Sequence, residues 1–205
     1  IDATGPAISG LGINPADPIK NDTTTNVTVN FTLTEAMKPG VLPQLSYLLS
    51  KAGRTPVAIS SVTATGGLNY QASFTLPTDA GQGAVENLQF VYQGQDDLDN
   101  LSTSITAPNR FQVYQGALPP SGVPLNFTAK PQPGGKVKLS WSAVTDVVAY
   151  QLYRQAPNEA SLSAFQRVTG TDYTDATTAD GTYRYAIASI RAANGQESLS
   201  AQRAT

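Results

Sequence analysis

Alternation of apolar and polar residues, broken at intervals by turn residues, is the feature of this sequence that most limits its fold. Val27, Val29, Phe31 and Leu33 alternate with threonine and asparagine, which is the period of a β-strand with one buried face. Gly- and Pro-rich turn segments such as 38–40 separate the alternating runs. No segment keeps the 3.6-residue period of a helix. The sequence therefore predicts an all-β protein.

The chain divides most clearly at the segment 116–122. With 205 residues it is long enough for two domains of about 100 residues each. Pro119 and Pro120 favour an extended polyproline II path, which makes a short, semi-rigid connector. The expected organisation is a first sandwich at 1–116, a Pro-rich linker at 117–122 and a second sandwich at 123–205.

Each half contains enough strand candidates for a two-sheet sandwich. Asn194-Gly195 is a strong hairpin signal, because both central positions of a type I′ turn require positive φ. The first half has candidates at 7–13, 26–34, 44–49, 57–64, 70–76, 85–92 and 102–113, and the second at 125–129, 137–142, 149–154, 165–168, 172–174, 181–190 and 197–202.

Residue types that are absent or rare exclude several function classes. The sequence has neither His nor Cys, which excludes Ser-His-Asp and Cys-His catalysis, imidazole-ligated zinc and disulfides. The net charge is −2 and no Lys/Arg cluster is present, which argues against a nucleic-acid partner. No apolar run reaches the length of a membrane span, so membrane insertion is not expected.

The second half resembles a fibronectin type III module. Trp141 matches the core tryptophan of that family's second strand, and Tyr150 and Leu152 match the inward pair of its third strand. Tyr183 matches the tyrosine-corner position. The resemblance covers about residues 121–205 and implies a two-sheet sandwich. Integrin binding is not implied, because 193–196 reads Ala-Asn-Gly-Gln where integrin-binding members carry Arg-Gly-Asp.

The first half is similar to bacterial immunoglobulin-like repeats. Residues 2–6 resemble their Asp-x-Thr-x-Pro opening, 31–37 their strand followed by Glu, and 94–100 the Asp-rich turn before their last strand. Asp99 stands where that turn usually has Gly. The resemblance implies a bacterial immunoglobulin-like sandwich over about residues 1–116.

The Asp-rich turn is a candidate metal site with an alternative interpretation. Asp96, Asp97, Asp99 and Asn100 could present oxygen ligands to Ca²⁺, with Asp2 at the seam to a preceding repeat. The alternative is a polar turn whose side chains bond the local backbone. We favour the polar turn and expect no metal or cofactor, because one loop supplies few calcium ligands.

Aromatic residues raise the question of a sugar-binding surface. Trp141 is expected in the core. Tyr153 is out of phase with the inward pair, so we expect it to be exposed, as well as one of Tyr47 and Tyr70. Single exposed tyrosines are ordinary surface and do not predict a sugar site.

Two carboxylate pairs could in principle serve glycoside hydrolysis, which needs two acids facing each other across a cleft. They are Asp79 with Glu86, and Asp172 with Asp175. Both pairs are expected in turns without a cleft, so we expect no catalytic residues and no enzyme activity.

The expected function is that of a non-catalytic structural, adhesive or interaction tandem from a larger bacterial secreted or cell-surface protein. Its partner would be a protein or polysaccharide at the cell surface, or neighbouring modules of the same chain, in an extracellular, cell-surface or periplasmic location. The chain begins with Ile1, as expected of a processed or excised fragment. The alternative, implied by the fibronectin type III resemblance, is an accessory, carbohydrate-associated pair of modules in a secreted polysaccharide-degrading enzyme.

Overall fold

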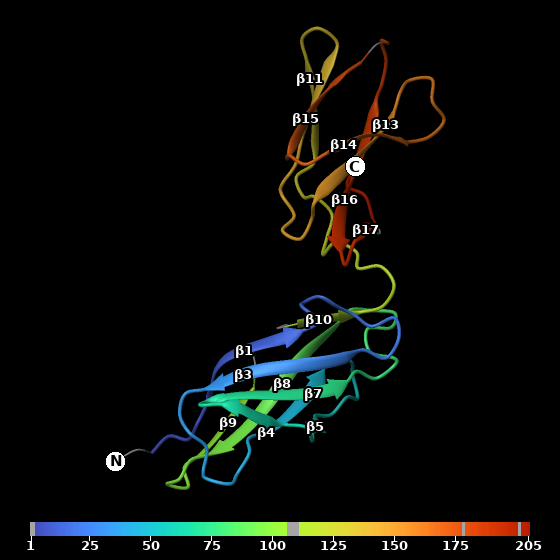
Figure 1. The fold of residues 1–205 in the computed structure, drawn as a ribbon. Coiled ribbons are helices and arrows are strands. Elements are labelled where there is room, and N and C mark those ends of the chain that lie inside the picture. Colours follow the sequence, from blue (N-terminus) through green and yellow to red (C-terminus); the bar gives the residue numbers. More distant parts are fainter. Residues whose placement is uncertain (1–2, 106–110, 178, 201) are drawn as a thin grey trace. The chain divides into compact units, whose positions relative to one another are not determined.

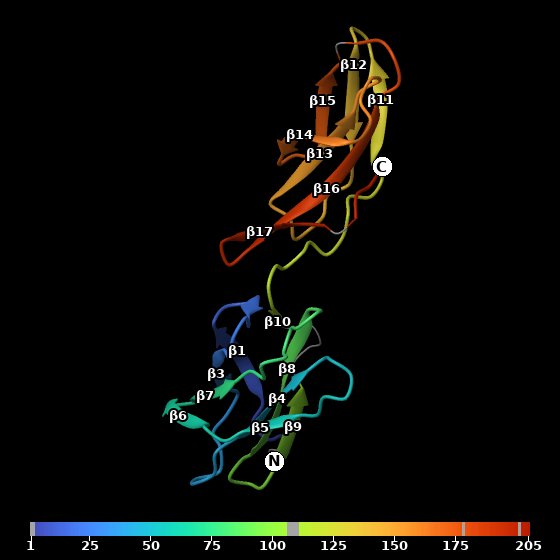
Figure 2. The same cartoon turned by 90° about the vertical axis from the view of Figure 1, so that its right-hand side faces the viewer.

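The computed structural model describes residues 3–105, 111–177, 179–200 and 202–205, and all regular structure in these ranges is β-strand (Figures 1 and 2). The chain forms two compact units, Ile1–Gly116 and Ala117–Thr205. Each unit packs two mainly antiparallel sheets against each other. The all-β prediction of two tandem immunoglobulin-like sandwiches is confirmed.

The sheets of the first unit have the strand order of an immunoglobulin-like sandwich. One sheet has the order β1-β3-β7-β6, and the other β2-β10-β8-β4-β5 with β9 also paired to β8, which corresponds to the A-B-E-D and G-F-C sheets of that fold. The strands are β1 (Ile8–Asn14), β2 (Ile19–Lys20), β3 (Asn26–Leu33), β4 (Gln44–Leu49), β5 (Val57–Ile59), β6 (Thr63–Gly66), β7 (Asn69–Thr75), β8 (Glu86–Gln95), β9 (Leu101–Ile105) and β10 (Phe111–Tyr114).

The core of the first unit follows from the alternation in its long strands. Val27, Val29, Phe31 and Leu33 of β3 are buried, while the residues between them lie on the outer face. From the other sheet, β8 contributes Leu88, Phe90 and Tyr92, all fully buried. Burying each large side chain of this kind stabilises the fold by roughly 1.5–3 kcal/mol.

The second unit pairs a three-stranded sheet, β11-β12-β15, with a four-stranded sheet, β14-β13-β16-β17. Trp141 packs edge-on against Tyr150 with ring centroids 5.5 Å apart, in one cluster with Leu152, so the predicted core positions are confirmed. The strands are β11 (Thr128–Gln132), β12 (Lys136–Ser140), β13 (Ala149–Gln155), β14 (Ser163–Val168), β15 (Asp172–Ala176), β16 (Arg184–Ala193) and β17 (Gln196–Leu199).

Two local features of the second unit agree with the sequence. The Tyr183 hydroxyl donates to the Ala179 carbonyl at 3.1 Å and accepts from the Ala179 amide at 3.3 Å, which is the backbone contact of a tyrosine corner. Asn194 and Gly195 have φ of 48° and 76° in the turn between β16 and β17, as the predicted hairpin requires.

Two strand predictions for the first unit need correction, and one strand of this unit was not predicted. The candidate at 57–64 is two strands, β5 and β6, which pair with β4 and β7 in opposite sheets. The candidate at 102–113 is β9 and β10, with 106–110 outside the described residues. Strand β2 was not predicted, because two residues are too short to show a period. Alternation shows that a segment is extended but not where it crosses between sheets.

The Pro-rich segment makes its hydrogen bonds with the second unit, to which residues from Ala117 onward belong. The Leu118 carbonyl accepts a hydrogen bond from Ser198 Oγ, and the Pro119 carbonyl accepts one from Arg191 at 3.4 Å. The Ser121 amide and hydroxyl both donate to the Asp146 carboxylate at 2.9 Å. Residues 118–121 are therefore attached to the second unit along their length.

Candidate functional site

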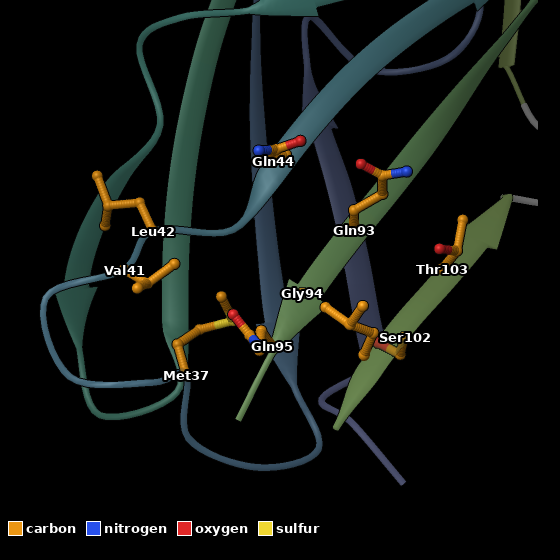
Figure 3. Close-up of a pocket in the computed structure, with 10 residues that line it drawn as sticks. Met37, Val41, Leu42, Gln44, Gln93, Gly94, Gln95, Ser102 and Thr103 are labelled. Carbon is orange, nitrogen blue, oxygen red and sulfur yellow. The ribbon is translucent and has the colours of Figure 1, made fainter. Parts of the chain in front are cut away.

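A hollow of about 210 Å³ lies on the outer face of the β4-β8-β9 part of the first unit (Figure 3). Strand β8 passes through its centre, the segment between β3 and β4 stands on one side, and β9 stands on the other. The lining residues are Met37, Val41, Leu42, Gln44, Gln93, Gly94, Gln95, Leu101, Ser102 and Thr103.

Strand register determines which side chains reach this face. Gln93 is paired with Gln44 on one side and with Thr103 on the other, and side chains of directly paired residues lie on the same face of a sheet. The intervening Gly94 faces the interior, where a Cβ would lie only 2.0 Å from the Tyr92 hydroxyl. The alternation of β8 thus places glutamines outside and the buried Tyr92 inside.

The chemistry of the hollow is apolar and amide-rich. Met37 is buried, whereas Val41, Leu42 and Leu101 at the rim are 40%, 51% and 76% exposed. None of the ten lining residues carries an acid, a base or a charge, so the hydroxyls of Ser102 and Thr103 have no basic neighbour there to activate them. The hollow can bind by packing and hydrogen bonding, but it supplies no acid–base chemistry.

Charge is distributed very differently in the two units. In the described strands of the first unit the charged residues are Lys20 and the buried Glu86, and the other described charges lie in turns and connecting segments. Every strand of the second unit carries at least one charged residue. The sheet faces of the first unit are therefore electrically neutral surfaces.

The outer face of the other sheet of the first unit is a polar ladder between β3 and β7. Thr75 Oγ1 donates to Asn26 Oδ1 at 2.6 Å and Gln71 Nε2 donates to Asn30 Oδ1 at 2.9 Å, across directly paired positions. Thr32 Oγ1 likewise donates to the Asn69 side chain at 2.8 Å. These bonds fix the orientation of the amide and hydroxyl groups on this face.

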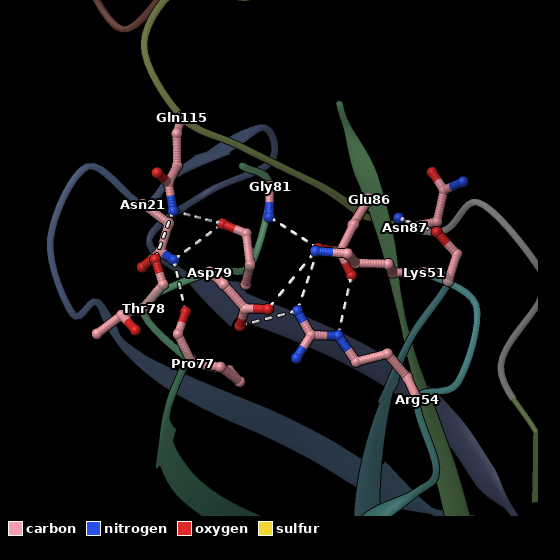
Figure 4. A network of polar contacts seen from close by, with 12 residues as sticks. Asn21, Lys51, Arg54, Pro77, Thr78, Asp79, Gly81, Glu86, Asn87 and Gln115 are labelled. Carbon is pink, nitrogen blue, oxygen red and sulfur yellow. Dashed lines mark hydrogen bonds and ion pairs between the residues drawn. The ribbon is translucent and has the colours of Figure 1, made fainter. Parts of the chain in front are cut away.

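The predicted carboxylate pair Asp79 and Glu86 is brought together by an arginine (Figure 4). Arg54 Nη2 lies 3.1 Å from Asp79 Oδ1 and 3.3 Å from Glu86 Oε1, and the Gly81 amide donates to Glu86 at 3.0 Å. The hydrogen bond from Arg54 lowers the pKa of Asp79. Both carboxylates are occupied in this way, so the arrangement braces the 77–86 segment and leaves no acid facing a second acid across a cleft.

The same segment is fixed from its other side. Asn21 is fully buried and its Nδ2 donates to the carbonyls of Pro77 and Ala80 at 2.9 and 3.0 Å. Gln115 Nε2 donates to the carbonyls of Thr78 and Ala80. Figure 4 shows these amides converging on the turn. We interpret the whole network as structural. Its amides and Glu86 bond backbone groups that would otherwise be unpaired, and Arg54 pairs with both carboxylates.

The second predicted pair, Asp172 and Asp175, does not form a shared site. Asp175 is buried, receives two hydrogen bonds from Arg154 at 3.0 and 3.1 Å, and accepts the Tyr185 hydroxyl at 2.7 Å. Burial, together with this bond to Asp175, raises the pKa of Tyr185. Asp172 is exposed and lies 3.6 Å from Lys138. Sequence reasoning missed Arg154, although an arginine within a mainly apolar strand is a signal for a buried partner.

The Asp-rich turn bonds to itself and to its neighbours. Asp96 is 3% exposed, accepts the amides of Leu98 and Asn100 at 2.9 and 2.8 Å, and accepts Asn100 Nδ2 at 2.8 Å. Asp99 is bound by Lys38 and by Gln95. Burial opposes the ionised form of Asp96, but the bonds from Asn100 and Leu98 outweigh it and lower its pKa.

This geometry is that of the polar turn that the sequence favoured. Asp97 is exposed on the same turn, and Asp2 lies outside the described residues. Across the described ranges, no three Asp, Glu, His or Cys residues gather closely enough to hold a metal ion.

The predicted exposed tyrosines are wrong. Tyr153 does point away from the Trp141 core, but it is only 6% exposed, because it packs with Leu162 and Ala186 and the Arg203 guanidinium lies 3.7 Å from its ring centroid. Tyr47 and Tyr70 are both buried and stack on Phe74 and Phe31 respectively. These side chains therefore form no aromatic platform for a sugar ring.

No helix in the part of the chain that the structure describes is long and apolar enough to cross a membrane. No family model and no curated protein matches the sequence. Among solved structures, the chain is similar to two fibronectin type III domains of chicken tenascin, with 14% identity over 96% of this chain and 95% of that one and a TM-score of 0.37.

Two further solved structures have the same general similarity. The human OSCAR ligand-binding domain is 20% identical over 94% of this chain and 93% of that chain, with a TM-score of 0.42. The FN1–FN3 domains of chicken CNTN1 are 11% identical over 91% of this chain and 68% of that chain, with a TM-score of 0.35. The fold assignment rests on the strand order and packing described above.

Proposed function

We propose that this chain is a non-catalytic pair of immunoglobulin-like modules from a bacterial secreted or cell-surface protein, acting as a spacer that also presents a binding surface. The observation that carries the proposal is where the ionisable side chains lie: they are absent from the lining of the hollow, and the buried carboxylates bond to other protein groups. The hollow in Figure 3 is lined without any titratable side chain. The buried carboxylates Glu86, Asp96 and Asp175 are instead committed to bracing turns and sheets.

An assay for catalysis tests the first part of the proposal. The purified chain is incubated with glycoside, peptide and ester substrates, and we expect no turnover above a buffer control. Matched variants are Glu86→Gln, which alters a buried carboxylate, and Asp97→Asn, which alters an exposed one. Turnover that persists through purification and is lost in a correctly folded Glu86→Gln variant would contradict a non-catalytic role.

A second experiment tests the location. Antibodies raised against the chain are applied to intact and to permeabilised cells of the source organism. We expect labelling of intact cells, or recovery of the antigen from the medium. Labelling that requires permeabilisation of the inner membrane would contradict a secreted or surface location.

The polar ladder favours a neutral polysaccharide as one partner. Its amides and hydroxyls are uncharged and held in place by one another, which lowers the entropic cost of binding a hydroxyl-rich polymer. Affinity electrophoresis in gels containing dextran, xylan or hydroxyethyl cellulose tests this. We expect retardation that Asn30→Asp and Gln71→Glu remove and that Gln93→Glu on the opposite sheet leaves intact. Equal mobility with and without all three polymers would reject this partner class.

A further inference from the structure

We propose that the chain associates weakly with a second copy of itself through the outer face of β4, β8 and β9. Leu101 of each copy would enter the Met37 hollow of the other. The inference adds a partner to the proposed function but does not depend on a surface location or on the absence of catalysis.

The first argument is shape. A twofold interface brings the same patch of both copies together, so that patch must contain both a protrusion and a space to receive it. Leu101 is 76% exposed, and it lines the hollow of about 210 Å³ whose opposite wall is formed by Met37, Val41 and Leu42. Figure 3 shows Met37, Val41 and Leu42 on one side of β8, and strand β9, to which Leu101 belongs, on the other. The patch therefore contains an apolar projection beside an apolar recess.

The second argument is charge. When a face meets its own copy, every charge near the twofold axis approaches a like charge, which is destabilising. This face avoids the problem because no charged side chain lines the hollow. Asp99 accepts a hydrogen bond from the lining residue Gln95, and its charge is paired with that of Lys38. The sheet faces of the second unit lack this property, because every strand there carries a charge.

The third argument is hydrogen bonding. Gln44, Gln93 and Thr103 lie side by side on three neighbouring strands. A glutamine amide or a threonine hydroxyl both donates and accepts, so such a row can bond to an identical row without a complementary partner. The exposed apolar area is small, so the association is expected to be reversible and detectable at roughly 10–500 µM.

Sedimentation velocity of the full chain over that concentration range tests the proposal. We expect the weight-average sedimentation coefficient to rise with concentration. Gln93 is on the central strand of the face, between Gln44 and Thr103. In the proposed dimer it would lie near its own copy, so Gln93→Lys and Gln93→Glu should each abolish the rise. An equimolar mixture of the two variants should restore it, because opposite charges then face each other.

Two further variants control for folding and for location. Leu101→Ser changes a highly exposed side chain and should also abolish association without lowering the melting temperature. Gln71→Lys places the same charge on the opposite sheet and should leave association intact. A sedimentation coefficient that is independent of concentration would overturn the proposal. Association that survives Gln93→Lys and Leu101→Ser, or a Lys/Glu mixture that stays monomeric, would overturn it as well.

Discussion

Asp175 links the two sheets of the second unit through a single carboxylate. It lies on β15, whereas its partners Arg154 and Tyr185 lie on β13 and β16 of the facing sheet. Arg154 also covers the Phe165 ring at 4.9 Å from its centroid. Removing one member of such a buried group leaves the others without a partner, which costs more than the net value of the interaction.

We therefore expect Asp175→Ala to lower the free energy of unfolding of the second unit by about 2–4 kcal/mol. The exposed Asp172, on the same strand, provides the control, and Asp172→Ala should cost no more than about 0.5 kcal/mol. Trp141 is the only tryptophan in the sequence, so its fluorescence in a denaturant titration reports on this unit. Equal losses for the two variants would show that the buried group contributes little.

Tyr153 gives a second test among the side chains of this unit. Its ring is buried under Leu162 and Arg203 on the outer face of the sheet, so Tyr153→Ala should cost about 2–4 kcal/mol. Tyr153→Phe keeps the ring and should change stability little, and Arg203→Ala should remove about 0.5–1 kcal/mol of cation–π stabilisation. An alanine variant as stable as the phenylalanine variant would mean that the ring is solvated.

Among the turns, the segment 96–100 should make the stability of the first unit depend on pH. The pKa of Asp96 is lowered in the folded state, so its contribution is present above the unfolded pKa of about 3.9 and is lost as pH falls through the folded value. Asp96→Asn should therefore lower the melting temperature at pH 7, and the difference from wild type should shrink toward pH 2. Asp97→Asn, at an exposed position, should show no such trend. A difference that is constant over pH would assign the effect to lost packing.

Calcium should not bind at the same turn or stabilise it. Asp96, Asp99 and Asn100 already bond to protein groups, so a cation would have to displace these bonds. Adding millimolar Ca²⁺, with Mg²⁺ as control, should leave the melting temperature of the first unit unchanged. A calcium-specific increase that Asp96→Asn abolishes would restore the metal-site interpretation.

At the scale of the whole chain, the Pro-rich segment 118–121 is held by hydrogen bonds to the second unit. Asp146 accepts both hydrogen bonds of Ser121 and lies 3.1 Å from Arg191, which also reaches Pro119. Asp146→Ala should therefore speed amide exchange at Ser121 and lower the stability of the second unit by about 1–2 kcal/mol. Asp180→Ala, in an exposed turn, serves as control. Unchanged exchange at Ser121 would mean that these bonds contribute little.

Local patterns identified most of the strands and most of the core of the second unit. Val27 to Leu33 alternate strictly, and Trp141, Tyr150 and Leu152 have the spacing of a sandwich core, so periodicity alone identified their inward faces. The Asn194-Gly195 turn and the polar turn at 96–100 were equally predictable, because each is stabilised by bonds within a few residues.

Only the tertiary structure determined which residues cover the outer faces of the sheets and which charged side chains form ion pairs. The period of two predicts on which face of the sheet the Tyr153 side chain lies. It cannot predict that Arg203, fifty positions later in the sequence, packs over the Tyr153 ring and helps to bury it. Arg54 joins carboxylates 25 and 32 positions away. The Met37 hollow likewise combines three separate segments. Such contacts depend on strand order and register, which are set by the packing of the entire sandwich and leave no mark in local sequence.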